Sequence, residues 1–226
     1  MKIKFGAIVT DGRGKIGGHV LAKNRSGNYM RTKVTPVNPQ TTYQQTQRAA
    51  LGTLSSGWSG LTDEQRTSWD AAAQTHQRTD IFGDLRTPTG KNQYTGANKN
   101  RLNSNLPIIS VPIESIPLPS FQIISATANS DVQQIHIQTS DIGSDFYVQI
   151  WATAPMSQGT SFVKNKLRLL KTMQQTMMPV FELYPEYEAR FGTFTINSNI
   201  VVGVVIVNNA GDTTVMQTSK VLIING

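Results

Sequence analysis

Glycines and basic residues near the N-terminus have types and spacing that could bind a phosphate group. Gly12-Arg-Gly-Lys-Ile-Gly-Gly18 has the glycine density of a phosphate-binding loop. A P-loop ends in Gly-Lys-Ser/Thr at the start of a helix, and a dinucleotide fingerprint also opens a helix. Here a strand-like segment follows instead. The pattern therefore predicts a glycine-rich hairpin with strands near residues 5–10 and 19–23 and a second turn at residues 25–28.

The other reactive side chains form no catalytic or metal-binding pattern. His19, His76 and His136 are the three histidines, and none lies in a metal-ligand motif. The sequence has no cysteine and no Gly-x-Ser-x-Gly elbow. Asp80 and Asp84 could form a general acid and base, but Gly83 between them favours a turn. We expect a protein that is not an enzyme, with no catalytic residues, no metal and no cofactor.

The net charge of +7 is unevenly distributed along the chain. Up to Arg101 there are fifteen Lys and Arg against six Asp and Glu, or about +9, and the remainder has six against eight, or about −2. The excess lies in a basic arm. Such an arm can dock on acidic protein neighbours or bind along nucleic-acid phosphates. The charge alone does not distinguish these two functions. The candidate partner-binding residues are Arg13, Lys15, Lys23, Arg25, Tyr29, Arg31 and Lys33.

The composition indicates a globular protein whose apolar segments are too short to span a membrane. The 226 residues are 38% hydrophobic, which is enough for a core, and only 15% are charged. The resulting surface of Ser, Thr, Asn and Gln is common in extracellular and particle-bound β proteins. The longest apolar run, residues 200–207, is too short to span a membrane. The N-terminus lacks the apolar core of a signal peptide, so we expect no Sec export.

Residues 41–105 predict a helical hairpin that anchors the arm, which we place at residues 1–40. Apolar positions repeat at helical spacing up to Trp58, and Thr62 begins a second helix with acidic residues in its first turn. We expect Trp58 to close against Trp69 as structural core. The face predicted to be buried on the first helix comprises Tyr43, Leu51, Leu54 and Trp58. A third helix over residues 90–103 is weakened by Gly96 and Asn98.

Residues 106–119 contain four prolines and predict an extended linker that packs along a surface. The following region, residues 120–226, is rich in Val, Ile, Phe and Thr between turn residues. We expect six or seven strands in an immunoglobulin-like or fibronectin-like sandwich with Trp151 as structural core. Residues 171–191 predict a loop or short helix. The fold class is therefore α+β. Expected strands are residues 121–127, 132–139, 146–153, 161–171, 200–208 and 213–224.

A resemblance extends this interpretation. Asn24-Arg-Ser-Gly-Asn-Tyr29, Pro36-Val-Asn-Pro39, Trp58, Leu61-Thr-Asp-Glu-Gln-Arg66 and Trp69 together resemble a group of uncharacterised virion structural proteins of tailed bacteriophages. The resemblance covers residues 6–119 well and the β region only in type. Members continue with a Pro-rich linker and a variable β domain.

The resemblance implies a structural protein of the virion, made in the host cytoplasm. It is expected on the capsid as a minor or decoration protein, or at the head-to-tail neck. Its partners would be capsid, portal or neck subunits, and it would be a homo-oligomer or present in many copies. Two alternatives stay open: a nucleic-acid-binding module that uses the basic arm, and a carbohydrate-binding accessory of host adsorption.

Overall fold

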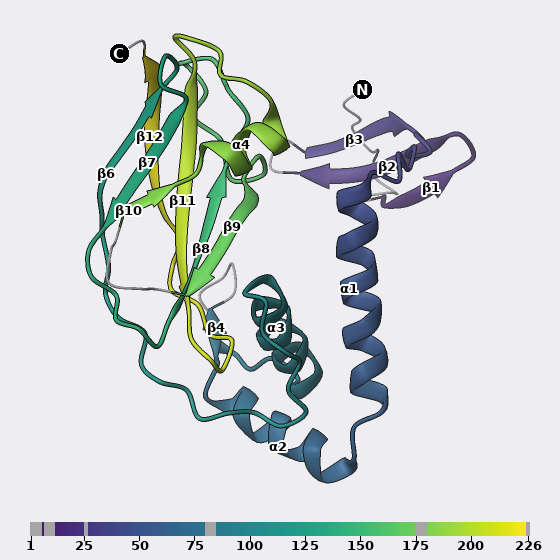
Figure 1. Ribbon diagram of the computed structural model, residues 1–226. Coiled ribbons are helices and arrows are strands. Elements are labelled where there is room, and N and C mark those ends of the chain that lie inside the picture. The colour runs from purple at the N-terminus through teal and green to yellow at the C-terminus, as the bar shows by residue number, and fades with distance from the viewer. Residues whose placement is uncertain (1–5, 7–11, 25–26, 80–84, 175–179, 225–226) are drawn as a thin grey trace. The chain divides into compact units, whose positions relative to one another are not determined.

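The computed structural model describes residues 6, 12–24, 27–79, 85–174 and 180–224 (Figure 1). Near the N-terminus, β1 (Gly14–Ile16), β2 (His19–Asn24) and β3 (Gly27–Thr32) form an antiparallel sheet in that order. The tight turn at Gly17 and Gly18 joins the first two strands, and the β2–β3 hairpin falls where the sequence predicts its second turn. The predicted strand at residues 5–10 lies largely outside the described residues.

Three helices follow: α1 (Thr42–Ser59), α2 (Asp63–Gln74) and α3 (Gly90–Asn103). Thr62 caps α2 with a complete capping box, because its hydroxyl accepts from the Gln65 N–H while the Gln65 side chain accepts from the Thr62 N–H. The N-terminus of α3 is held by the Asp70 carboxylate, which accepts from the Gly90 N–H at 2.9 Å. This contact ties the start of α3 to α2. A short antiparallel pair lies between these two helices, β4 (Arg78–Thr79) with β5 (Leu85–Arg86).

Tyr94 of α3 is the centre of the helical core, which differs from the sequence prediction. Its ring lies 5.5 Å from the ring of Trp58 and 5.5 Å from the ring of Trp69. The two tryptophans therefore pack on a shared tyrosine. Trp69 and Tyr94 are buried, whereas Trp58 is half-buried. The prediction underrated α3 because its helix propensity is low, and tertiary packing overrides that preference.

The predicted buried face of α1 is wrong at Tyr43 and Leu51. Leu54 is fully buried, but Leu51 is 57% exposed and Tyr43 is 36% exposed. Helix α3 approaches α1 closely at Gly57, where an added Cβ would lie 2.6 Å from the Tyr94 hydroxyl. Burial on α1 is thus confined to its C-terminal half, where α3 provides a partner surface.

Residues 106–119 form neither helix nor strand and are held against the helices by hydrogen bonds. The Trp69 indole N–H donates to the Ser110 carbonyl at 2.9 Å. Asn98 and Ile109 exchange two hydrogen bonds, of 3.1 and 2.8 Å. Arg101, which is buried, donates to the Pro107 carbonyl at 2.9 Å. These bonds satisfy backbone groups that a proline-rich strand could not pair in a sheet.

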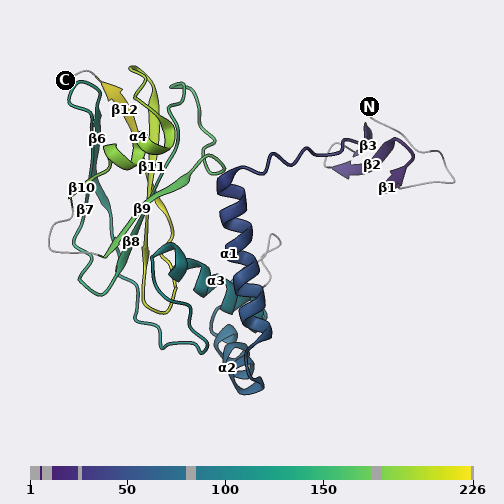
Figure 2. The ribbon, with the colours of Figure 1, turned by 45° about the vertical axis from the view of Figure 1, so that its right-hand side comes forward.

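The C-terminal region forms one curled seven-stranded sheet (Figures 1 and 2). Its order is β10-β7-β6-β12-β11-β8-β9, and all neighbours are antiparallel except β12 and β6. The α+β class is confirmed. The seven strands are β6 (Ile123–Asn129), β7 (Gln134–Thr139), β8 (Tyr147–Ala152), β9 (Arg168–Gln174), β10 (Val180–Glu182), β11 (Asn199–Val207) and β12 (Gln217–Ile224).

Strand β11 is buried along its whole length on both faces, which explains its unbroken apolar sequence. One face contributes to the main core, which includes Ile200, Val202 and Ile206. The other face is covered in part by α3. Gln149 of β8, which pairs with Val205 of β11, donates from its side chain to the Asn100 carbonyl and the Ser104 hydroxyl at the end of α3. The helices and this sheet therefore share one packed body.

Helix α4 (Tyr184–Phe191) lies between β10 and β11, in the region predicted to be a loop or short helix. Its Tyr187 is fully buried and packs on Phe191 and Phe194. Trp151, predicted as structural core, is only half-buried. It packs on a smaller cluster with Met156, Leu167 and Val201, outside the main core, because it points to the face of β8 opposite that core.

The chain divides into two units, Met1–Thr46 and Gln47–Gly226, and the division falls inside α1. The three-stranded sheet belongs to the first unit, and α2, α3 and the seven-stranded sheet belong to the second. The predicted boundaries at residues 40, 105 and 119 stay predictions. Within the described part of the chain, no helix combines the length and apolar character that crossing a membrane needs.

Candidate docking surface

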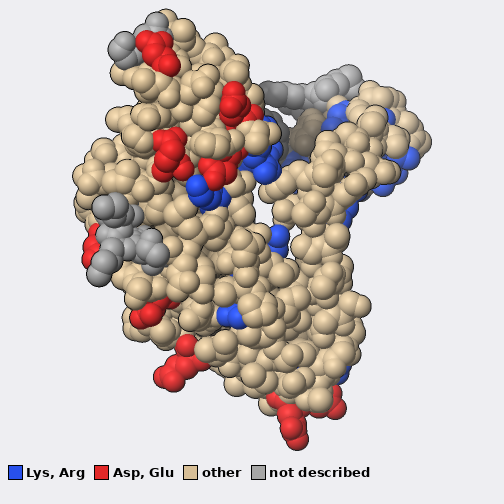
Figure 3. Space-filling model, viewed as in Figure 1, with Lys and Arg blue, Asp and Glu red and all other residues tan. Residues whose placement is uncertain are grey.

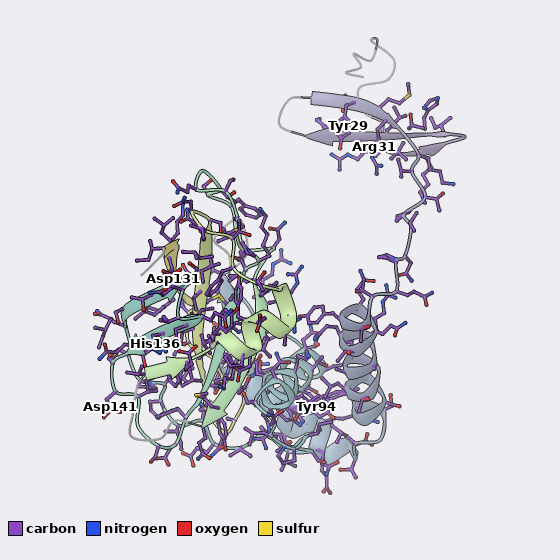
Figure 4. All side chains as sticks on the ribbon, turned by 45° about the horizontal axis from the view of Figure 1, so that its top comes forward. Tyr29, Arg31, Tyr94, Asp131, His136 and Asp141 are labelled. Carbon is purple, nitrogen blue, oxygen red and sulfur yellow. The ribbon has the colours of Figure 1, made fainter. Side chains whose placement is uncertain are left out.

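Strand register brings four of the predicted partner-binding residues to one face of the three-stranded sheet. Lys15 pairs with Val20, and Val20 pairs with Arg31, so their side chains share a face. Tyr29 lies two residues before Arg31 on β3 and projects from the same face. Figure 4 labels Tyr29 and Arg31 on this strand. Lys33 continues the alternation, since its N–H donates to the Gly18 carbonyl at 2.8 Å. We call Lys15, Tyr29, Arg31 and Lys33 the basic face.

The sequence around the basic face has no charge of opposite sign. From residue 12 to residue 62 there is no Asp or Glu, whereas seven residues are Lys or Arg. Blue basic atoms lie over the three-stranded sheet in Figure 3. An anionic partner of this stretch would therefore meet attraction without local competition. The seven are Arg13, Lys15, Lys23, Arg25, Arg31, Lys33 and Arg48.

The three-stranded sheet has no buried core of its own. Among the described residues of the unit Met1–Thr46, none is buried. Lys15, Arg31 and Lys33 are exposed, Tyr29 is half-buried, and Ile16 on the opposite face is 66% exposed. A small sheet without a covered apolar face is at best marginally stable alone. The described residues of this unit therefore supply none of the burial that stabilises an ordinary domain.

The remaining predicted docking residues are not part of the basic face. Lys23 pairs with Asn28 and projects from the opposite face of the sheet. Arg13 is exposed and immediately precedes β1. Arg25 lies outside the described residues. The seven predicted residues thus do not form one surface, because strand alternation separates positions that the charge count treats alike.

Ser115, Asp212 and His76 lie close together in the unit Gln47–Gly226, and the sequence did not predict this cluster. The Asp212 carboxylate lies 2.9 Å from His76 Nε2 and accepts from the Ser115 hydroxyl at 2.5 Å. In a hydrolytic triad the histidine stands between the serine and the aspartate. Here the aspartate stands in the middle, so His76 cannot take the serine proton. The arrangement joins the segment that follows α2, the segment 106–119 and the β11–β12 loop.

A second group of charged residues connects α4 to the sheet. Glu182 Oε1 accepts from the backbone N–H groups of Ile135, Leu183 and Tyr184, and its Oε2 lies 2.6 Å from His136 Nε2. Figure 4 labels His136 on the sheet. This network fixes the edge strand β10 against β7. In the described ranges, no three His, Asp or Glu side chains gather closely enough to hold a metal ion.

Burial shifts the pKa of several groups, and Lys99 and Tyr187 are two of those whose shift comes from burial alone. Partial burial lowers the pKa of Lys99, whose Nζ donates to the Asn103 side chain at 2.9 Å. Full burial raises the pKa of the Tyr187 hydroxyl. Desolvation is the cause in both cases, and no charged partner contributes. Both shifts are consequences of packing.

Comparisons with known proteins give little guidance. No family model matches the sequence, and no curated protein matches it. Among solved structures, the chain is similar to the glycoside hydrolase domain of Endo-D from Streptococcus pneumoniae R6, at 14% identity and a TM-score of 0.27. The match covers 49% of this chain, which spans 15% of the length of that one. A similarity at this level carries no argument about fold or activity.

Proposed function

We propose that the protein is a non-enzymatic structural subunit of a tailed bacteriophage particle, held to neighbouring virion subunits by its N-terminal unit. The observation that carries this proposal is the three-stranded sheet, in which no described residue is buried. Ordering a residue costs roughly 1–2 kcal/mol of backbone entropy, and this sheet has little buried surface to offset that cost. A partner that covers the sheet supplies the missing contacts.

The charge of the arm supports an acidic protein surface as that partner. Lys15, Arg31 and Lys33 lie together and exposed on the basic face, and no acid occurs between residues 12 and 62. Exposed ion pairs contribute only about 0–1 kcal/mol each. Docking therefore depends on desolvating several pairs together with exposed apolar side chains of the opposite face, such as Ile16. A capsid, portal or neck subunit with an acidic groove fits these requirements.

We also infer that the curled sheet is a sandwich of the fibronectin-like or immunoglobulin-like type. The strand order supports this inference, because β6, β7 and β10 are neighbours in one half while β8, β9, β11 and β12 are neighbours in the other. Among the described residues, the strand pairing between the two halves comprises two parallel residue pairs, Ile223 with Ala128 and Ile224 with Asn129. Such domains are common as rigid modules on particles and cell surfaces, which suits a structural subunit.

The test is incorporation into particles. A phage lacking this gene is complemented with the wild-type chain or with the triple variant Lys15→Gln, Arg31→Gln, Lys33→Gln, and purified particles are probed for the protein. We expect the wild type in the particles and a strong loss of the triple variant. The matched control Lys91→Gln, Lys164→Gln, Lys166→Gln removes the same charge from exposed positions outside the arm. Absence of the wild-type chain from particles would refute the virion assignment.

A second candidate function is binding of nucleic acid through the same face. The observation that favours it is Tyr29, an aromatic ring beside Arg31 on a basic sheet, since bases stack on such rings. Binding of single-stranded DNA by the isolated chain, measured over a salt series, separates the candidates. This function predicts strong salt dependence and a shallower slope for the triple variant. Protein docking predicts no measurable DNA binding by either chain near physiological salt.

A further inference from the structure

A polar pocket of about 330 Å³ lies between the helices and the β11–β12 loop. One wall is a single face of α3, formed by Gln93, Gly96, Ala97 and Asn100 at helical spacing. Figure 1 shows the yellow β11–β12 loop beside α3. The loop approaches this helix closely, since Asn100 donates to the Gly211 carbonyl at 2.8 Å. The rest of the lining comprises His76, Ser115, Leu118, Gly211, Asp212 and Thr213.

The charged groups of the pocket are already paired with each other. His76 Nε2 lies 2.9 Å from one Asp212 oxygen. The other oxygen accepts from the Ser115 hydroxyl at 2.5 Å and lies 3.4 Å from the Asn208 side-chain amide. The lining contains no Lys or Arg. An anionic ligand would meet the Asp212 carboxylate without a free cation to offset it. The pocket therefore suits an uncharged molecule.

The polar groups left free in the pocket are neutral. Gln93 is only 7% exposed, and its side-chain amide makes no hydrogen bond to the part of the chain that the structure describes. The Asn100 side chain uses its N–H toward Gly211 and keeps its oxygen, and the Thr213 hydroxyl lies at the exposed rim. Together they offer both donors and acceptors.

We propose that this pocket binds a single neutral sugar residue. Its volume is at the lower end of the roughly 300–1,000 Å³ of small-molecule sites and suits one pyranose ring. Sugar hydroxyls both donate and accept, which matches the amide of Gln93, the Asn100 oxygen and the Thr213 hydroxyl. Ala97 and Leu118 supply apolar contact for the C–H face of the ring. The proposal does not depend on the virion assignment, since it uses only the unit Gln47–Gly226.

The experiment measures saturation-transfer NMR of the full chain with free glucose, galactose, mannose and N-acetylglucosamine at millimolar concentration. We expect transfer to at least one sugar from the wild type. The variant Gln93→Leu removes the amide at nearly constant volume, and its affinity is expected to fall at least tenfold. The matched control Gln122→Leu removes an exposed glutamine amide outside the pocket and should bind as the wild type does.

A second variant keeps the test decisive if Gln93→Leu does not fold. At Gly96 an added Cβ would meet no heavy atom within 4 Å, so Gly96→Leu fits the helix and fills the pocket. It should abolish saturation transfer while its circular dichroism stays that of the wild type. The proposal is overturned if no sugar receives saturation from the folded wild type. It is also overturned if either folded pocket variant binds sugar normally, or if inorganic phosphate displaces the sugar.

Discussion

The two larger sheets described in this protein have similar hydrogen bonding but opposite burial. In the three-stranded sheet β1–β3 no described residue is buried, whereas in β11 of the seven-stranded sheet all nine residues are buried. Backbone pairing is present in both, so it does not account for the difference. The difference in burial comes from what covers each sheet, because β11 has the main core on one face and α3 with neighbouring loops on the other. A sheet without such cover contributes little to stability by itself.

Helix α1 shows the same contrast within three residues. Leu51 is 57% exposed, and Leu54 is fully buried. Leu54 belongs to the cluster around Trp69 and Tyr94, whereas the first half of α1 has no buried residue. The division of the chain into two units at Thr46 and Gln47 falls in this exposed half. Stability is therefore expected to reside in the unit Gln47–Gly226.

The largest expected effect is at the centre of the helical core. Trp69→Ala removes a ring that is 2% exposed and a hydrogen bond to Ser110, and it should lower the free energy of unfolding by about 3–5 kcal/mol. Trp58→Ala should cost less, because that ring is half-buried. Urea unfolding of the full chain measures both. Equal losses for the two variants would contradict the asymmetry around Tyr94.

A smaller loss is expected where the β11–β12 loop meets α3. Gly211 has φ +90°, and an added Cβ would lie 2.3 Å from the Ala97 carbonyl oxygen. Gly211→Ala should therefore lower the free energy of unfolding by about 1–3 kcal/mol, through backbone strain and overpacking. Gly159→Ala is the control, since its Cβ would meet nothing within 4 Å. A neutral Gly211→Ala in thermal unfolding would show that loop and helix separate without cost.

Local signals predicted the element types well and the packing partners poorly. The capping box at Thr62, the turn glycines and the alternating strands gave α2 and most of the β region. The weak third helix predicted over residues 90–103 is present as α3, but its low propensity gave no indication that both tryptophans pack on Tyr94. Strand β9 begins at Arg168, later than the predicted start at residue 161. The prediction that Tyr43 and Leu51 are buried was wrong. Helical spacing identifies the apolar face of a helix, but it does not show how much of that face another element covers.

The candidate sites show the same limit. Charge counting found the arm, but only strand register separates Lys15 and Arg31 from Lys23. His76 and Asp212 are 136 residues apart in sequence, and the pocket beside them combines a helix, the segment 106–119 and a loop. No local sequence pattern indicates that these distant residues lie together in the fold. The free amide of Gln93 could be found only from the fold, because its neighbours in sequence are ordinary helix residues.

The smallest expected effect on stability is in the arm, and it completes the comparison of the two sheets. Tyr29→Ala should change the free energy of unfolding by less than about 0.5 kcal/mol, the usual range for surface positions, because the three-stranded sheet has no buried residue among those described. Limited trypsin digestion of the isolated chain should cut first after Lys15, Arg31 or Lys33, since proteases attack exposed and weakly packed segments. The unit Gln47–Gly226 should persist as the resistant fragment. In assembled particles the same three bonds should be protected if a neighbouring subunit covers the basic face. Equal resistance of the arm in the isolated chain and in particles would mean that it gains no cover on assembly, and the exposed half of α1 would then be the surface left to hold a partner.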